Sequence, residues 1–139
     1  MSAIVEMLRK HEGVETHAYK CTADKTTIGV GRNIDPSGGI GLSEDEIDYL
    51  LANDVKRVYA ELSGAFRWFK MVAPARQDAM MDMCFNMGLP RLKKFKKALA
   101  AMAKGDYNNA AIEFLDSRWA TQVGQRAITI TDIIRSGEY

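Results

Sequence analysis

HEGVETHAYKCTADKTTIGVGRN, residues 11–33, joins the end of a predicted helix to a group of predicted short strands. Its second half and the residues just after it place Thr27, Val30 and Ile34 between glycines and polar residues. This pattern is typical of short strands that meet at tight turns. We therefore expect a small β structure here, directly after a helix.

The residues before this stretch predict that helix. Ser2 is a suitable N-cap, the apolar residues after it recur at helical spacing, and Gly13 is the residue type that commonly follows a helix end. Glu12 then lies at the helix C-terminus, where the negative end of the macrodipole is unfavourable for a carboxylate. A local rule broken in this way often marks a functional site.

Glu12, Cys21 and Thr27 are the candidate catalytic residues, with eight residues between the first two and five between the last two. Taken singly, they are compatible with a surface glutamate, a small buried thiol and an ordinary strand residue. Their joint spacing indicates a hydrolytic site. A general acid at a helix end, opposite a water-holding pair on an adjoining hairpin, is the geometry that hydrolysis of a glycosidic bond requires.

The rest of the chain predicts helices. Ser43 and Glu46 form a capping-box pattern, and the apolar residues between 47 and 62 share one helical face, so we expect a long helix over 43–63. A glycine-rich loop, 35–41, precedes it. Further along, Pro74 and Pro90 suit the first turn of a helix, and Gly88 and Gly105 suit helix ends. Asp106 can cap the helix that follows it.

Five ordered motifs carry a resemblance to a known family: MLRKHEG (7–13), TIGVGR (27–32), CFNMG (84–88), SRWATQVGQRA (117–127) and IIRSGEY (133–139). Together with the spacing of the candidate catalytic residues, they resemble the phage lysozymes, or endolysins, of glycoside hydrolase family 24, of the T-even type. The likeness covers nearly the whole chain.

The resemblance implies an α+β fold of lysozyme type with two lobes in a single lysozyme domain, 1–139. A small β-hairpin lobe would comprise 13–45, a mainly helical lobe would comprise 1–12 and 65–139, and the helix over 43–63 would connect them. The segment 127–134, AITITDII, is rich in β-branched residues and by pattern alone would be a strand. The resemblance makes it a helix, and we expect packing to override the weak propensity.

The implied activity is that of a muramidase, which cleaves the β-1,4 bond between N-acetylmuramic acid and N-acetylglucosamine in bacterial peptidoglycan. Glu12 would protonate the leaving oxygen, while Cys21 and Thr27 would orient the attacking water. Cys21 stands where the best-known members carry aspartate, although cysteine is an allowed alternative in the pattern. An unperturbed thiol has a pKa of about 8.5, so Cys21 could hold water as a neutral thiol, act as a base, or attack the sugar and make the enzyme retaining. The analogy favours water handling and inversion.

The matching motifs imply further site residues. Gly31, Arg32 and Asn33 would lie at the hairpin edge beneath the sugar cleft, and Phe85 and Asn86 at its back. Phe85 could instead belong to the core.

Three more residues have both a functional and an ordinary interpretation. Arg126 corresponds to an arginine that pairs with the catalytic glutamate, here Glu12, but it could be a plain surface arginine. His11 could tune Glu12 or simply favour the helix end electrostatically. Trp119 is expected to pack in the core rather than to form a sugar platform.

Composition limits the remaining possibilities. The chain has 139 residues, of which 47% are hydrophobic, and its net charge is +1. No apolar run is long enough for a membrane helix and no signal-peptide pattern is present, so we expect no membrane insertion. A monomer is the default expectation. If it is an endolysin, it would accumulate in the host cytoplasm and reach the periplasm and wall when a phage holin opens the inner membrane.

Neither a metal-ligand cluster nor a phosphate loop is visible, so no metal or other cofactor is expected.

Two local features need separate interpretations. The cluster RLKKFKK, 91–97, could attract the protein to anionic wall or outer-leaflet phosphates, or could be a solvated face, with Phe95 turned into the core. Nucleic-acid binding is not expected, because the overall charge is balanced and aromatic interleaving is missing. Cys84, in the apolar stretch MMDMCF, is expected in the core, and two cysteines are too few for a disulfide framework.

Two other functions remain open. One is a cysteine-dependent wall amidase or peptidase, with Cys21 as nucleophile and His17 or His11 as base. The other is an inactive wall-binding module that kept the cleft. Retention of both Glu12 and Thr27 favours the muramidase over the inactive module.

Overall fold

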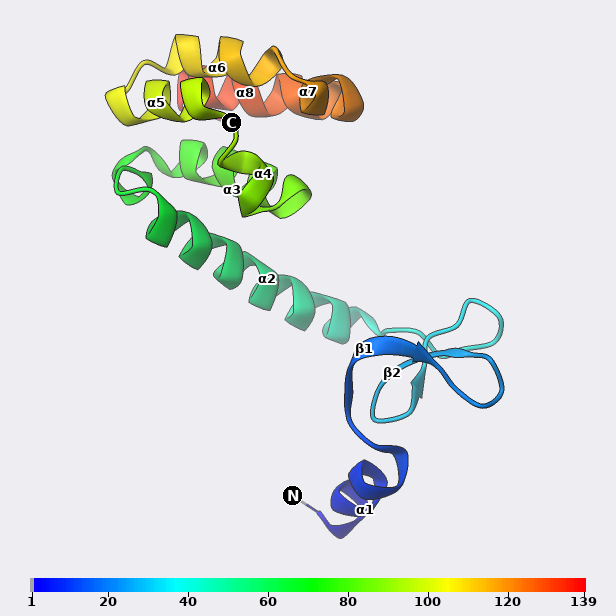
Figure 1. Ribbon diagram of the computed structural model, residues 1–139. Helices are drawn as coiled ribbons and strands as arrows, with labels where there is room; N and C mark the ends of the chain where they lie inside the picture. Colours follow the sequence, from blue (N-terminus) through cyan, green and yellow to red (C-terminus); the bar gives the residue numbers. More distant parts are fainter. Residues whose placement is uncertain (1) are drawn as a thin grey trace. The chain divides into compact units, whose positions relative to one another are not determined.

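The computed structural model describes residues 2–139. Over these residues the chain forms eight α-helices, one short 3-10 helix and a three-stranded sheet, which confirms the predicted α+β class. The chain folds into two compact units, one that ends at Leu50 and a second that runs from Leu51 to Tyr139. The boundary falls inside helix α2, Glu44–Ala65 (Figure 1). The predicted assignment of 1–12 and 65–139 to one lobe stays a prediction.

The first unit begins with α1, Ala3–Glu12, whose two ends form as the sequence predicts. The Ser2 hydroxyl accepts a hydrogen bond from the Val5 backbone N–H at 3.4 Å. Gly13 follows the helix with φ of 78°, and its N–H donates to the Arg9 carbonyl at 3.0 Å. Glu12 is therefore the last residue of α1.

The sheet of the first unit contains β1, Glu15–Lys20, β2, Thr26–Gly29, and β3, Arg32–Asn33. The strands are antiparallel in the order β1-β2-β3, so the predicted small β structure is confirmed. Thr27 pairs with Tyr19 on one side and with Asn33 on the other, which places it at the centre of the sheet.

The predicted capping box starts α2. The Ser43 backbone N–H donates to Glu46 Oε1 at 2.8 Å, and the Glu46 N–H donates to the Ser43 hydroxyl at 3.4 Å. These reciprocal bonds satisfy two backbone donors at the helix start. The helix predicted over 43–63 thus forms, with bounds shifted by one or two residues.

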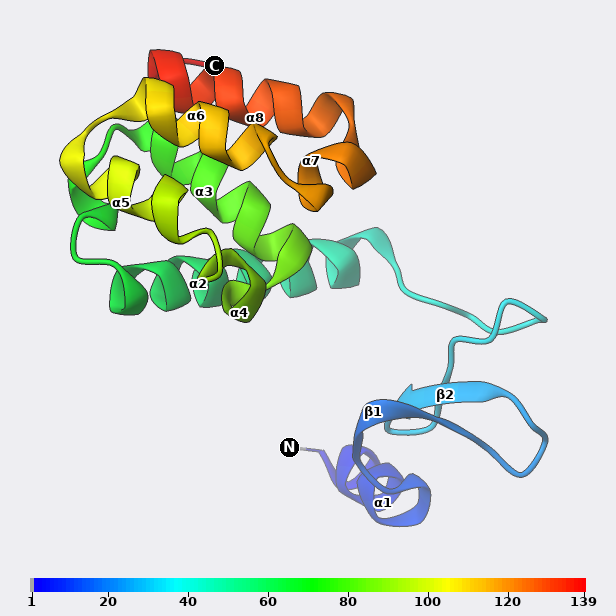
Figure 2. The ribbon, with the colours of Figure 1, turned by 45° about the horizontal axis from the view of Figure 1, so that its top comes forward.

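The second unit is helical (Figure 2). After the 3-10 helix η1, Phe69–Met71, come α3, Pro74–Met87, α4, Leu89–Leu92, α5, Lys96–Lys104, α6, Tyr107–Leu115, α7, Arg118–Val123, and α8, Gln125–Ser136. Helix α6 packs against α5 and α8, and α3 packs against α8. The predicted helix signals are confirmed: Pro74 and Pro90 lie in first turns, Gly88 and Gly105 follow helix ends, and Asp106 caps α6.

One core fills this unit. Its fully or almost fully buried side chains come from α2, η1 and each later helix, and the largest are Val58, Leu62, Phe69, Met80, Met83, Leu92, Met102, Phe114 and Ile134. Burial of this apolar area is the main favourable term for folding the unit. Cys84 is also buried in this core, as predicted.

Residues 127–134, which composition favours as a strand and the family resemblance as a helix, lie in helix α8. Ala127, Ile130, Thr131 and Ile134 are its buried residues, and they recur at helical spacing. The buried Thr131 hydroxyl donates to the Ala127 carbonyl at 2.8 Å, so its polar group is satisfied within the helix. The helix predicted over 127–134 is confirmed.

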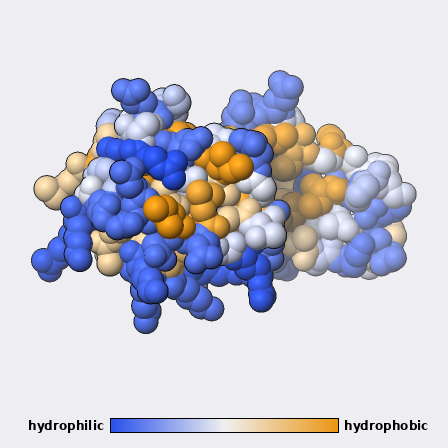
Figure 3. All heavy atoms as spheres, turned by 90° about the horizontal axis from the view of Figure 1, so that it is seen from above, coloured by the Kyte–Doolittle hydropathy of each residue, from blue (hydrophilic) through white to orange (hydrophobic). Residues whose placement is uncertain are grey.

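Hydrophilic residues cover most of the face shown in Figure 3, with small groups of hydrophobic residues between them. None of the helices formed by residues 2–139 combines the length and the hydropathy needed to span a lipid bilayer.

Candidate active site

The first unit places the carboxylate of Glu12 against the turn between β2 and β3. A Cβ atom added to Gly31 would lie 2.6 Å from Glu12 Oε2, so only a glycine fits beside this carboxylate as it stands. Gly31 also has φ of 64°, a left-handed conformation that favours glycine. The sequence predicted Gly31 as an edge of the sugar cleft, whereas its contact with Glu12 was not expected.

Cys21 closes the β1–β2 hairpin. Its Sγ accepts a hydrogen bond from the Lys25 backbone N–H at 3.4 Å. This bond is the largest cause that lowers the pKa of the Cys21 thiol, with a second contribution from the Ala23 backbone N–H and partial opposition from burial. A hydrogen bond donated to the sulfur stabilises the thiolate more than the neutral thiol, so it lowers the pKa. The thiol therefore ionises more readily than an ordinary cysteine.

Thr27 lies beside this thiol. Its side chain is buried and its hydroxyl donates to the Lys25 carbonyl at 2.8 Å. A hydroxyl that donates to the backbone keeps its lone pairs available to accept a bond from water. Cys21 and Thr27 thus both bond to the Lys25 backbone, and their predicted role as a water-holding pair stays a prediction.

Arg32 and Asn33 already have partners inside the first unit. The Arg32 guanidinium contacts both carboxylate oxygens of Glu46, each at 2.8 Å, and donates to the Gly41 carbonyl at 3.1 Å. Asn33 Oδ1 accepts the Asp35 backbone N–H at 2.9 Å. These contacts anchor the hairpin edge to the start of α2 and to the loop before it. Their predicted role in binding sugar stays a prediction.

The histidines do not form a cysteine–histidine pair. His11 is exposed in the last turn of α1, and His17 Nδ1 lies 3.0 Å from the Thr16 hydroxyl. Within the part of the chain that the structure describes, no hydrogen bond joins Cys21 to either of them. These contacts therefore give the cysteine amidase or peptidase alternative no positive support.

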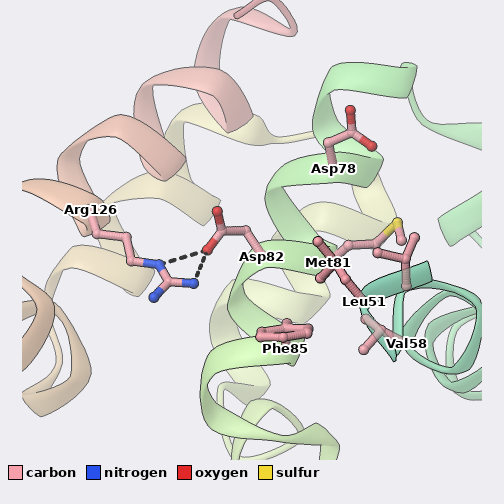
Figure 4. A pocket seen from close by; sticks show the side chains of 8 residues that line it. Leu51, Val58, Asp78, Met81, Asp82, Phe85 and Arg126 are labelled. Carbon is pink, nitrogen blue, oxygen red and sulfur yellow. Dashed lines mark hydrogen bonds and ion pairs between the residues drawn. The ribbon is translucent and has the colours of Figure 1, made fainter. Parts of the chain in front are cut away.

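In the second unit, Phe85 lines a cavity of about 300 Å³ rather than the core (Figure 4). Its side chain is 48% exposed, so the alternative interpretation of Phe85 as a core residue is wrong. The wall of the cavity is apolar at Leu51, Val55 and Met81. Exposed aromatic and aliphatic surface in a concave site is typical of ligand-binding pockets.

Arg126 meets Asp82 at the edge of this cavity, as Figure 4 shows. Its Nη2 lies 2.6 Å from Asp82 Oδ1, and its Nε donates to the same oxygen at 2.7 Å. Sequence reasoning missed Asp82, although an acidic residue in the apolar stretch MMDMCF was a signal for it. The predicted pairing of Arg126 with Glu12 stays a prediction.

Asn86 is held by Trp119. The indole Nε1 donates to Asn86 Oδ1 at 2.9 Å, and the Trp119 ring is buried, which confirms its predicted place in the core. The Asn86 amide nitrogen has donors left for a ligand. Both residues line a cavity of about 470 Å³, whose cations are Arg91, Lys94 and Arg118.

The basic cluster 91–97 has its cations exposed and its aromatic residue turned inward. The Phe95 ring centroid lies 5.4 Å from that of Phe114 and 6.4 Å from that of Trp119, which confirms that Phe95 packs on the core. Attraction of the cluster to an anionic wall stays a prediction.

Comparison with known proteins supports one family. Residues 9–132 match the family model described as Phage lysozyme. A probable T4-type lysozyme of Dictyostelium discoideum is 28% identical over 163 aligned positions, which cover 99% of this chain and 96% of that protein. An endolysin of Acyrthosiphon pisum secondary endosymbiont phage 1 is 25% identical over 86% of this chain and 80% of its own length. The pre-baseplate central spike protein Gp5 of Enterobacteria phage T4 is 28% identical over 97% of this chain, which corresponds to 28% of the spike protein.

Proposed function

Because the chain belongs to the phage lysozyme family and is thus a lysozyme-type hydrolase, we propose that it is a muramidase of the bacterial wall. Its substrate is the β-1,4 bond between N-acetylmuramic acid and N-acetylglucosamine in peptidoglycan. The observation that carries the proposal is the arrangement of the first unit, where Glu12 lies against Gly31 and the sheet holds Cys21 and Thr27 together.

Glu12 is the general acid. Its carboxyl proton passes to the oxygen that links the two sugars while the bond from this oxygen to the anomeric carbon of N-acetylmuramic acid breaks. Gly31 leaves room for this position of the carboxyl group, where an added Cβ atom would clash with it. The leaving group is the 4-hydroxyl of N-acetylglucosamine.

Cys21 and Thr27 handle the water. The Thr27 hydroxyl can accept a hydrogen bond from a water molecule, and the Cys21 thiolate can accept the proton that this water loses as its oxygen bonds to the anomeric carbon. The lowered pKa of the Cys21 thiol makes the thiolate available nearer to neutral pH than that of an ordinary cysteine. Attack opposite the leaving group inverts the anomeric configuration.

This proposal extends to the biological setting. The family and the endolysin relative support the wall as the place of action. We propose that the protein acts as a monomer that lyses the host and releases phage progeny, with access to the wall provided by a holin.

The stereochemistry of the first product tests the mechanism. Proton NMR of the reaction with a soluble peptidoglycan fragment resolves the anomeric proton of the new reducing end before mutarotation. Inversion predicts that the α-anomer forms first. If the β-anomer forms first, Cys21 attacks the sugar and the enzyme is retaining. If no reducing end forms although wall amide bonds are cut, the amidase alternative replaces the muramidase.

A further inference from the structure

The loop between β1 and β2 has an unusual backbone. The Cys21 N–H donates to the Lys25 carbonyl at 3.0 Å, and the Asp24 N–H donates to the Cys21 carbonyl at 2.8 Å. This is the hydrogen-bond pattern of a three-residue hairpin loop, in which a turn is followed by one residue in the left-handed conformation. That residue is Asp24, with φ of 60°.

The left-handed residue changes the partner of the next N–H group. In a regular closing pair of an antiparallel hairpin, the Lys25 N–H would donate to the Cys21 carbonyl. Here the Asp24 N–H occupies that carbonyl, so the Lys25 N–H is released. It reaches the Cys21 sulfur instead, at 3.4 Å.

We propose that Asp24 is a positioning residue for Cys21, because its left-handed backbone directs the Lys25 N–H to the sulfur atom. The role rests on the proposed function insofar as Cys21 handles the attacking water. Asp24 itself contacts neither substrate nor water in this account. It acts through the loop backbone, so what matters at this position is tolerance of a positive φ.

The backbone rather than the carboxylate of Asp24 carries this role. Among the residues that the structure describes, Asp24 is the non-glycine residue with a positive φ, and aspartate, asparagine and glycine tolerate that conformation best. Its side chain is exposed and makes none of the ion pairs found in residues 2–139. The charged neighbours are engaged elsewhere: the Lys25 ammonium donates to the Ser37 carbonyl, and that of Lys20 donates to Thr26 and lies 3.9 Å from Asp35.

Four substitutions separate backbone from charge. Asp24→Asn, Asp24→Gly, Asp24→Ala and Asp24→Val all remove the carboxylate. Asparagine and glycine keep the left-handed backbone, alanine adopts it at moderate cost, and the β-branched valine adopts it least readily. Circular dichroism and thermal unfolding of each variant verify folding, and Asp24→Ala serves as the informative variant if Asp24→Val does not fold.

The readout is the alkylation rate of Cys21 by iodoacetamide between pH 5 and pH 10, measured on the Cys21 peptide by mass spectrometry. The Cys84 peptide, from the buried core, is followed in the same samples as an internal reference. Below its pKa, the fraction of a thiol that is ionised changes about tenfold per pH unit. A rise of half a unit in the pKa of the Cys21 thiol therefore slows alkylation at pH 7 about threefold. We expect the pKa of the Cys21 thiol to rise by about this much in Asp24→Val and by less in Asp24→Ala. Asp24→Asn and Asp24→Gly should give the wild-type dependence of alkylation rate on pH.

The outcomes are distinct. Equal midpoints in all folded variants would overturn the proposal, and an equal shift in Asp24→Asn and Asp24→Val would replace it by an effect of the carboxylate. Alkylation does not depend on muramidase activity. If the expected series appears while no variant releases reducing ends from peptidoglycan, the positioning of Cys21 stands and the proposed function fails.

Discussion

Gly31 lies so close to Glu12 that a single added methyl group would come within 2.6 Å of the carboxylate oxygen Oε2. The neighbouring atoms Cδ and Cγ of Glu12 would lie at 2.8 Å and 3.1 Å from it. The candidate acid and the β2–β3 turn therefore constrain each other. A change at Gly31 should act on catalysis through the position of Glu12.

We predict that Gly31→Ala lowers the rate of reducing-end release by about 10-fold to 100-fold, because a displacement of a catalytic group by about 1 Å can cost that much. Gly29→Ala is the matched control. Gly29 has a similar φ of 69°, but an added Cβ there meets nothing within 4 Å. Both variants should lose about 1 kcal/mol of stability from the left-handed alanine. Equal activities of the two variants would show that the contact with Glu12 has no catalytic consequence.

Arg126 should matter for activity more than for stability. Its partner Asp82 is 45% exposed, and exposed ion pairs contribute about 0–1 kcal/mol. We predict that Arg126→Met and Asp82→Asn both change the free energy of unfolding in urea by less than about 1 kcal/mol. Arg126→Met should strongly reduce turnover if the arginine serves Glu12, whereas Asp82→Asn should not. Full activity of Arg126→Met would remove Arg126 from the candidate site.

Asn86 should stabilise the second unit through the Trp119 indole. Replacement by alanine removes the acceptor of this part-buried hydrogen bond, and loss of one such bond costs about 0.5–1.5 kcal/mol. Urea unfolding of Asn86→Ala, Trp119→Phe and the double variant measures the coupling between the two residues. Asn86→Asp, which keeps an acceptor, is the control and should lose less stability than Asn86→Ala. Additive losses in the double variant would mean that the hydrogen bond does not form in solution.

The Cys21 thiol should make stability depend on pH. Its pKa is lowered in the folded protein, chiefly by the Lys25 N–H, so the folded chain releases this proton at a lower pH than the unfolded chain. The resulting stabilisation is present above the unfolded pKa of about 8.5 and is lost as pH falls through the folded pKa. The stability difference between wild type and Cys21→Ser should therefore grow as pH rises through this range. A difference that stays constant with pH would contradict the lowered pKa.

Local sequence signals predicted the elements of the fold well. Ser43 with Glu46 and Asp106 before α6 are caps whose partners lie within three residues, so the signal and the structure share one stretch of chain. Composition alone predicted α8 wrongly as a strand. The correct signal was the helical spacing of Ala127, Ile130 and Ile134, since periodicity reports the packed face while β-branching reports only a weak preference.

The candidate site was only partly predictable. The spacing of Glu12, Cys21 and Thr27 was visible because all three lie in one hairpin and the helix before it. The pairing of Asp82 with Arg126 joins α3 to α8 across 44 residues, and no local pattern encodes such a contact. The role of Asp24 was hidden for a different reason, because it depends on backbone dihedral angles rather than on the identity of the side chain.

The central claim is that Glu12 is the acid of a muramidase in which Cys21 handles the water. The most direct measurement is reducing-end release from purified peptidoglycan by wild type, Glu12→Gln and Cys21→Asp across pH. The account predicts that wild type is active, that Glu12→Gln is inactive because a carboxamide cannot supply the proton, and that Cys21→Asp remains active because a carboxylate can also hold and deprotonate water. Absence of reducing ends with wild type, or an inactive but folded Cys21→Asp, would contradict it.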